Sequence, residues 1–113
     1  MSPITTHVLD THTGQPGRGM PLALSRRAAS GDYVLLASGV TNDDGRVRDL
    51  LEPGSLTPGV YQMRFDTAAY FAHHNTTGFY PEAVICFEIV DTDQHYHIPL
   101  LLSPFGYTTY RGS

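Results

Sequence analysis

Short apolar and β-branched segments alternate with glycine- and proline-rich breaks along the whole sequence. In residues 59–65 every second side chain is large and apolar, and this is the period with which a strand presents one face to a core. Segments this short, divided this regularly, are typical of an all-β protein. The pattern predicts strands over residues 4–10, 21–29, 33–40, 46–50, 59–65, 81–91, 95–102 and 105–111.

One segment has helical rather than strand character. Residues 67–74 contain two alanines and follow Asp66 and Thr67, either of which could accept a hydrogen bond from the first turn of a helix. Asn75 could end the helix, because asparagine tolerates a left-handed backbone. About eight strands and one short helix predict a β-sandwich of two sheets. The 113 residues fit a single domain, 1–113.

Two of the predicted strands carry histidine on a face that strand periodicity turns away from the core. In residues 95–102 one face is entirely apolar or aromatic, and the opposite face begins with His95 and His97 and continues with a proline and a leucine. His7 lies on a similar face of residues 4–10, between Thr5 and Leu9. The last strand adds threonine and tyrosine, and none of these faces carries an acid. Such surfaces suit an interface or a lined cleft better than open water.

Charge and cysteine content exclude several classes of protein. The net charge of −4, with only seven Lys and Arg residues, argues against a nucleic-acid-binding protein. Cys86 is the only cysteine and lies in an apolar segment, so we expect a small buried hydrophobic residue and no disulfide framework. The N-terminus lacks the regions of a signal peptide, and no apolar run approaches the ~20 residues that span a bilayer. We therefore expect a soluble, cytoplasmic protein with no membrane partner.

A zinc site is the main chemical alternative for the histidines. His95, His97 and His7 could bind Zn²⁺ if they converged. However, His95 and His97 are one strand repeat apart, roughly 6.5 Å, and no carboxylate or thiolate has obvious ligand spacing. We therefore expect no metal. His12 and the pair at 73–74 are expected to be ordinary surface histidines, and any single histidine is more often structural than catalytic.

Several short motifs follow one another along the chain: residues 7–11 with 14–16, 41–46, 79–82, 95–104 and the terminal Tyr-Arg-Gly-Ser at 110–113. Each motif alone is weak, but together they extend over nearly the whole chain and finish at its last residue. In this order they resemble the motifs of the 5-hydroxyisourate hydrolase family, which is related to the hormone carrier transthyretin. The segments 17–21 and 47–49 depart from the family pattern beside the motifs.

The resemblance implies a transthyretin-like sandwich, a homotetramer built as a dimer of dimers, and no cofactor. In this family 5-hydroxyisourate, a product of urate oxidation, is hydrolysed to 2-oxo-4-hydroxy-4-carboxy-5-ureidoimidazoline. Fold cannot separate such a hydrolase from a carrier of a small aromatic ligand, so the carrier stays as the alternative. The carrier has other residue types where this chain has His7, Arg46 and His97, and it lacks the Tyr-Arg-Gly-Ser ending.

The resemblance also implies a role for each matched residue. His7 and His97 would activate a water molecule as a pair, with His97 favoured as the base, since a neutral imidazole accepts a proton near pH 7. Arg46 would bind the carbonyl groups of the substrate and the developing oxyanion. Tyr110 and Ser113 would close the site around the substrate. Apolar edge strands at 81–91 and 105–111 would pair across the subunit interfaces of the tetramer.

Overall fold

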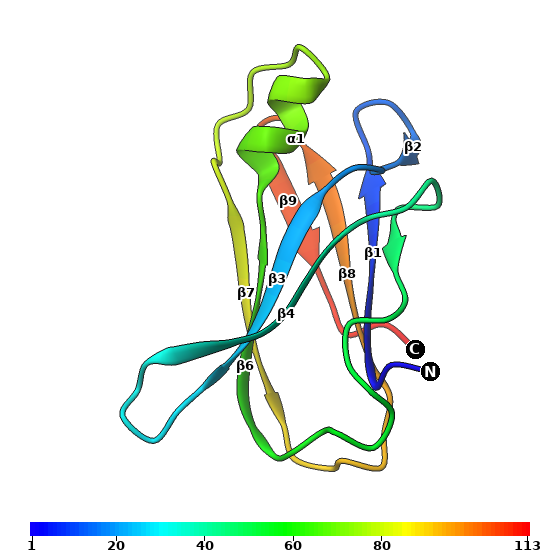
Figure 1. The fold of residues 1–113 in the computed structure, drawn as a ribbon. Coiled ribbons are helices and arrows are strands. Elements are labelled where there is room, and N and C mark those ends of the chain that lie inside the picture. Colours follow the sequence, from blue (N-terminus) through cyan, green and yellow to red (C-terminus); the bar gives the residue numbers. More distant parts are fainter.

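The computed structural model describes all 113 residues as two β-sheets packed face to face, with one helix at one end (Figure 1). No helix is long and apolar enough to cross a membrane. The elements in chain order are β1 (Ile4–Asp10), β2 (Gln15–Pro16), β3 (Pro21–Arg27), β4 (Tyr33–Val40), β5 (Arg46–Val47), β6 (Gly59–Phe65), α1 (Thr67–His73), β7 (Ala83–Ile89), β8 (Tyr96–Ser103) and β9 (Gly106–Thr109).

The first sheet has the strand order β2-β1-β8-β9, and β5 also pairs with β1. The second sheet has the order β4-β3-β6-β7, with all neighbours antiparallel. The pairing of β1 with β8 is parallel, and it places a strand from the N-terminal part of the chain beside one from the C-terminal part (Figure 1). β4 and β7 are the edges of the second sheet, and β9 is an edge of the first.

The core lies between the two sheets and follows the predicted alternation. β1 is buried at every second residue, from Ile4 to Asp10, and the residues between are half-buried. In β8 the predicted inward face is buried throughout, with Leu100 fully inaccessible. The second sheet contributes Tyr61, Met63 and Phe65, which are all almost inaccessible. The expected all-β sandwich of two sheets is therefore confirmed.

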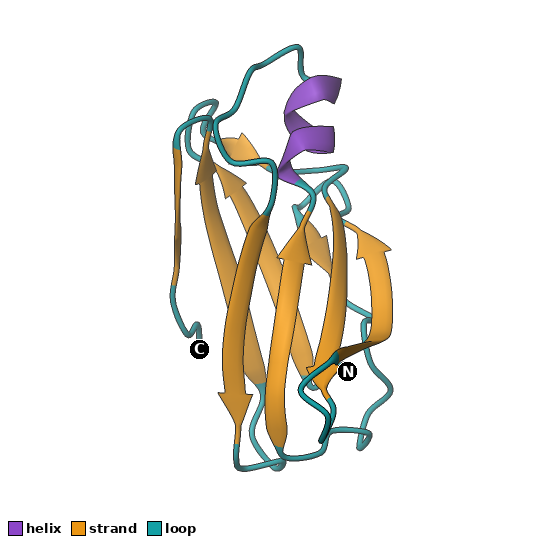
Figure 2. Ribbon diagram, turned by 90° about the vertical axis from the view of Figure 1, so that its left-hand side faces the viewer, coloured by secondary structure: helices purple, strands orange, loops and turns teal.

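The helix begins and ends where the sequence predicts, within one residue. The Asp66 carboxylate accepts a hydrogen bond from the Ala69 backbone N–H, and Asn75 adopts a left-handed φ of 53° just after the last turn. Tyr70 anchors the helix, because its hydroxyl donates to the buried Asp10 carboxylate at 2.7 Å. Figure 2 shows α1 above one end of the strands, so it leaves the sheet faces open.

Several expectations differ from the structure in detail. A short strand, β2, forms where the sequence predicts none, the strand predicted over 46–50 has only two residues, and the strand predicted over 21–29 ends at Arg27. The strands predicted over 81–91 and 105–111 are shorter at both ends. The prediction that Cys86 is buried is wrong, because the residue is exposed. It lies on the outward face of the edge strand β7, where its sulfur is 3.6 Å from the Tyr33 hydroxyl.

Candidate active site

The parallel pairing of β1 and β8 brings the two predicted histidine faces together. In this register Thr5 lies beside His97, and His7 lies beside Pro99, one pair further along the same face. The two histidines are therefore diagonal neighbours on the outward face of the first sheet, although 90 residues separate them in the sequence. Both are half-buried.

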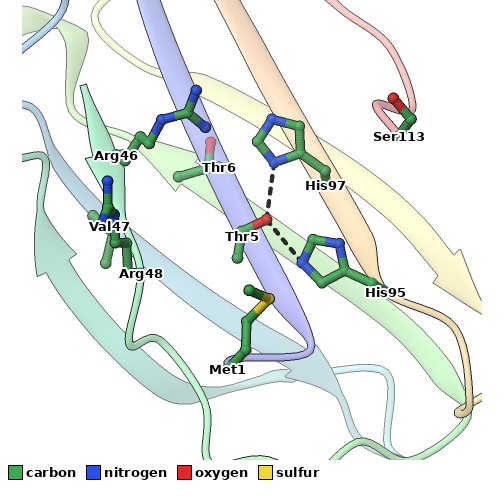
Figure 3. Close-up of a pocket in the computed structure, with 9 residues that line it drawn as sticks. All are labelled: Met1, Thr5, Thr6, Arg46, Val47, Arg48, His95, His97 and Ser113. Atoms are coloured by element: carbon green, nitrogen blue, oxygen red, sulfur yellow. Dashed lines mark hydrogen bonds between the residues drawn. The ribbon is translucent and has the colours of Figure 1, made fainter. Parts of the chain in front are cut away.

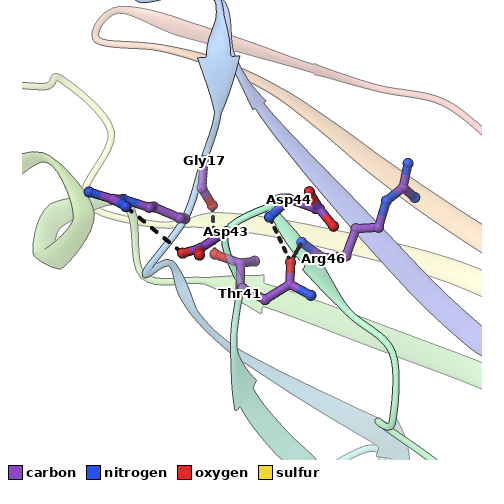
Figure 4. Close-up of polar contacts among 7 residues, drawn as sticks. Gly17, Thr41, Asp43, Asp44 and Arg46 are labelled. Atoms are coloured by element: carbon purple, nitrogen blue, oxygen red, sulfur yellow. Dashed lines mark hydrogen bonds and ion pairs between the residues drawn. The ribbon is translucent and has the colours of Figure 1, made fainter.

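Arg46 reaches this face through a tight turn that docks on β1 (Figure 4). The Asn42 side chain accepts hydrogen bonds from the backbone N–H groups of Asp44 and Arg46, each at 3.0 Å. Gly45 follows with a φ of 75°, and a Cβ there would lie 2.4 Å from the Val8 carbonyl oxygen. Only glycine fits this approach, and the result is that Arg46 pairs directly with His7 across β1 and β5.

A buried threonine holds the base of the same turn. Thr41 donates its hydroxyl proton to the Gly17 carbonyl at 2.6 Å and accepts from the Met20 backbone N–H at 2.8 Å (Figure 4). Met20 is fully buried in the core. The segment 17–21, which departs from the family pattern, therefore fixes the turn that presents Arg46.

The C-terminal tail closes onto His97. The Gly112 backbone N–H donates to the His97 carbonyl at 2.9 Å, and the two residues form a short antiparallel bridge. Arg111 anchors the tail from the side: its guanidinium donates to the Gln94 side chain at 2.7 Å and lies over the Tyr96 ring at 4.6 Å.

These elements surround an open hollow of about 500 Å³ (Figure 3). Arg46, His97 and Ser113 line it, whereas His7, which pairs with Arg46 across β1 and β5, is not among the lining residues. Tyr110 is exposed and lines a separate, smaller hollow on the other side of His97. The full lining of the larger hollow is Met1, Thr5, Thr6, Arg46, Val47, Arg48, His95, His97 and Ser113.

A single hydroxyl joins the two histidines of β8 and its preceding turn. Thr5 Oγ1 is 2.9 Å from His97 Nδ1 and 3.0 Å from His95 Nε2. Figure 3 shows both rings directed at this hydroxyl, with the second nitrogen of His97 on the side of the ring nearer Arg46. That nitrogen is the one available to a ligand in the hollow.

The surroundings of His7 and His97 favour the neutral imidazole. Burial lowers the pKa of each ring below its ordinary value, and the positive charge of Arg46 lowers both further. For His97, the neighbouring His95 and His7 act in the same direction, whereas a backbone hydrogen bond to Thr5 raises its pKa. For His7, the Asp44 backbone and carboxylate raise the pKa. A neutral imidazole beside a guanidinium can accept a proton while the arginine stabilises negative charge.

No group of three or more His, Cys, Asp or Glu side chains is arranged to hold a metal ion. One ring nitrogen of His95 and one of His97 lie within hydrogen-bond distance of the Thr5 hydroxyl. The two rings therefore share a hydrogen-bonding partner and do not point those nitrogens at a common metal position.

The sequence alone assigns no individual role at this site to Thr5, Arg48 or Gly112. Thr5 was noted only as part of an unusual face, and its place beside His97 depends on the β1–β8 register. Arg48 lines the hollow and lies 3.6 Å from the Asp44 carboxylate. The signal for Gly112 was its position in the terminal motif.

Comparison with known proteins places the chain among its relatives. A family model described as the HIUase/Transthyretin family matches residues 4–112. The chain belongs to the HIUase/Transthyretin family. A 5-hydroxyisourate hydrolase of Mus musculus is 47% identical over 113 residues, which are 99% of this chain and 96% of that protein. The resemblance inferred from the motifs is therefore confirmed.

Solved structures of this family share the fold. Sea bream transthyretin in complex with thyroxine matches with a TM-score of 0.94 and 34% identity, over 98% of this chain and 95% of that one. An (S)-allantoin synthase matches with a TM-score of 0.88 and 39% identity, over 97% of this chain and 43% of its own. Because the HIUase/Transthyretin family includes both a hydrolase and a thyroxine complex, the side chains at the site must decide the function of this member.

Proposed function

We propose that this protein is an enzyme that hydrolyses 5-hydroxyisourate to 2-oxo-4-hydroxy-4-carboxy-5-ureidoimidazoline in urate degradation. The observation that carries the proposal is that Arg46 and His97 line one hollow, with His7 beside Arg46 on the same sheet face. The name of the mouse relative supports the reaction. The match to an (S)-allantoin synthase supports a place in purine breakdown.

The chemistry required is hydrolysis of a cyclic amide. Water attacks the ring carbonyl carbon, and an imidazole takes the proton that the water loses. We favour His97 as this base, because its second nitrogen faces the hollow, and His7 then acts as its partner. The C–N bond of the tetrahedral intermediate breaks, the ring nitrogen takes the proton back from the imidazolium, and the new carboxyl group is released as carboxylate.

Arg46 supplies the positive charge that this sequence needs. Its guanidinium offers a planar set of donors that suits the carbonyl groups of a urate-like ring and the oxyanion formed on attack. Ser113 would contact the substrate from the tail, and Tyr110 would close the site by moving from its exposed position. No cofactor or metal enters the proposed mechanism.

A carrier of a small aromatic ligand is the second candidate, favoured by the structural match to the thyroxine complex. A carrier needs affinity without a base. The His97 imidazole, with its lowered pKa, and the Arg46 guanidinium are an unfavourable lining for an apolar ligand and a suitable one for a proton transfer. The site therefore favours the hydrolase.

We also propose that the active unit, domain 1–113, is a homotetramer. The edge strands β7 and β9 are open, and exposed apolar residues lie on or beside them, among them Val84 and Phe105. Pairing these edges between subunits would cover them, and the acid-free face of the first sheet would then line a channel between dimers. The cytoplasmic location stays a prediction from the sequence.

The deciding experiment follows the ultraviolet absorbance of freshly made 5-hydroxyisourate with and without purified protein. We expect a decay much faster than the spontaneous one, and His97→Ala and Arg46→Ala should each reduce turnover by at least ~100-fold. His12→Ala and Arg27→Ala are matched controls, because both residues are exposed and neither lines the hollow. An unchanged spontaneous rate with wild-type protein would refute the proposed function. Tight binding of iodinated phenols without hydrolysis would favour the carrier.

A further inference from the structure

The Thr5 hydroxyl has one proton to share between two imidazoles. Its oxygen lies within hydrogen-bond distance of both His97 Nδ1 and His95 Nε2, at 2.9 Å and 3.0 Å. A neutral imidazole has one N–H donor and one acceptor nitrogen, and a hydroxyl has one donor and two lone pairs. The three groups can therefore satisfy each other only in ordered arrangements.

If both rings donated to Thr5, its hydroxyl proton would need a third acceptor, and Thr5 Oγ1 has no other protein partner. Two arrangements therefore keep every proton within the three groups when both rings are neutral. In one, His97 donates from Nδ1 to Thr5, and Thr5 donates to His95, so that His97 Nε2 keeps its lone pair. In the other, His95 donates to Thr5, and Thr5 donates to His97 Nδ1, so that His97 Nε2 carries the proton. Only the first leaves His97 able to act as a base towards the hollow.

Two features of the site favour the first arrangement. The second nitrogen of His97 lies on the side of the ring nearer Arg46 (Figure 3), and a guanidinium, which only donates hydrogen bonds, is better placed beside a lone pair than beside an N–H. His95 is exposed, whereas His97 is half-buried. Water can therefore satisfy either tautomer of His95, while the protein must select the tautomer of His97.

We propose that Thr5 is a positioning residue that, with His95 as acceptor, holds His97 in the tautomer protonated on Nδ1. This inference rests on the proposed function, in which His97 is the base, and it assigns Thr5 and His95 a task that the reaction itself does not reveal. Thr5 transfers no proton to the substrate. It determines which nitrogen of His97 presents a lone pair to water.

The direct test is the ¹⁵N NMR spectrum of the histidine rings in the full-length protein at about pH 8, where imidazoles with a pKa near or below ~6.5 are neutral. In the wild type we expect a protonated Nδ1 and an unprotonated Nε2 for His97. Thr5→Val keeps the shape of the side chain without the hydroxyl and should give a tautomer mixture, whereas Thr5→Ser should restore the wild-type spectrum. A wild-type His97 protonated on Nε2, or an unchanged spectrum in Thr5→Val, would overturn the inference.

Kinetics give a second readout. Thr5→Val should lower kcat about fivefold to tenfold, the factor that one neutral hydrogen bond contributes, and should leave KM nearly unchanged. Thr5→Ser should recover most of the loss. Thr77→Val is the matched control, because Thr77 is exposed beyond α1 and makes no side-chain hydrogen bond to an imidazole. A rise in KM at constant kcat would show that Thr5 binds substrate instead of orienting His97.

The two proposals fail separately. If wild-type protein does not hydrolyse 5-hydroxyisourate but His97 has the Nδ1-protonated tautomer and loses it in Thr5→Val, the proposed function is wrong and the positioning role stands. If hydrolysis is fast and the tautomer does not depend on Thr5, the positioning role is wrong and the proposed function stands.

Discussion

Replacing Gly112 with alanine tests how closely the tail must approach His97. A Cβ at position 112 would lie 2.5 Å from His97 Cδ2 and 3.2 Å from Pro99 Cγ. Both atoms belong to side chains that the β1–β8 pairing holds in place, so they have little freedom to move aside. The tail, which is mostly exposed, must move instead, or the His97 ring must turn.

The size of the effect follows from that contact. The distance of 2.5 Å is about 0.9 Å short of the 3.4 Å at which ordinary contact begins. A misplacement of about 1 Å at a catalytic group can cost on the order of 100-fold in rate, so we expect Gly112→Ala to lower kcat by that factor. The fold should change little, because the bond lost first is the single one from Gly112 to the His97 carbonyl, worth about 1 kcal/mol.

Gly106→Ala is the matched control in the same part of the chain. Gly106 lies in β9, and the nearest atom to a Cβ there is Ser103 Oγ at an ordinary 3.8 Å. Turnover of 5-hydroxyisourate and the thermal unfolding midpoint should be measured for both variants. If Gly112→Ala stays within twofold of Gly106→Ala in turnover, the close approach of the tail to His97 has no catalytic role, and our reasoning about this contact is wrong.

Two further predictions concern pH and stability. The lowered pKa of His7 and His97 keeps both rings neutral to lower pH, so turnover should fall with a midpoint below the ordinary histidine value of 6.5. A midpoint at or above 6.5 would contradict this. Tyr70→Phe removes the donor to the buried Asp10 carboxylate and should lower the free energy of unfolding, measured by urea titration, by about 1.5–3 kcal/mol. Tyr107→Phe is the control and should have little effect, because the Tyr107 hydroxyl makes no internal hydrogen bond. Equal stability of the two variants would refute the anchoring role of Tyr70.

Much of the fold could be predicted because strand periodicity and glycine or proline breaks are local signals. β1 and β6 have the predicted bounds, and the alternation in β8 assigns its buried face correctly. Strand ends were less predictable. A strand ends where its pairing ends, and the partner of β5 is β1, which lies far earlier in the chain.

The error at Cys86 has a definite physical reason. Its segment is apolar enough to be a strand buried on both faces, and the sequence pattern alone does not distinguish that case from an edge strand. In the structure β7 is an edge of the second sheet, and Cys86 and Val84 lie on its outward face. Apolar residues there suit contact with another subunit, which the pattern of a single chain cannot show.

The candidate site was predictable as a set of residues but not as an arrangement. Strand alternation turned His7 and His97 outward, and the resemblance added Arg46 and the tail. Their contacts depend on register, which arises from tertiary packing, so the place of Thr5 between His95 and His97 had no local signal.

The register of one strand pair therefore controls the chemistry of the whole face. A shift of β8 by one residue against β1 would turn His97 into the core and bring a buried residue such as Ile98 out to the hollow, because side chains alternate along a strand. The buried side chains of both strands oppose such a shift through the apolar area that it would expose. Gly45 brings a turn, and Gly112 brings the C-terminal tail, so close to this face that a Cβ at either position would clash with it. Core packing and two backbone contacts together place Arg46, His97 and Ser113 at one hollow. Substitutions at these glycines should therefore impair catalysis as severely as substitutions of the side chains themselves.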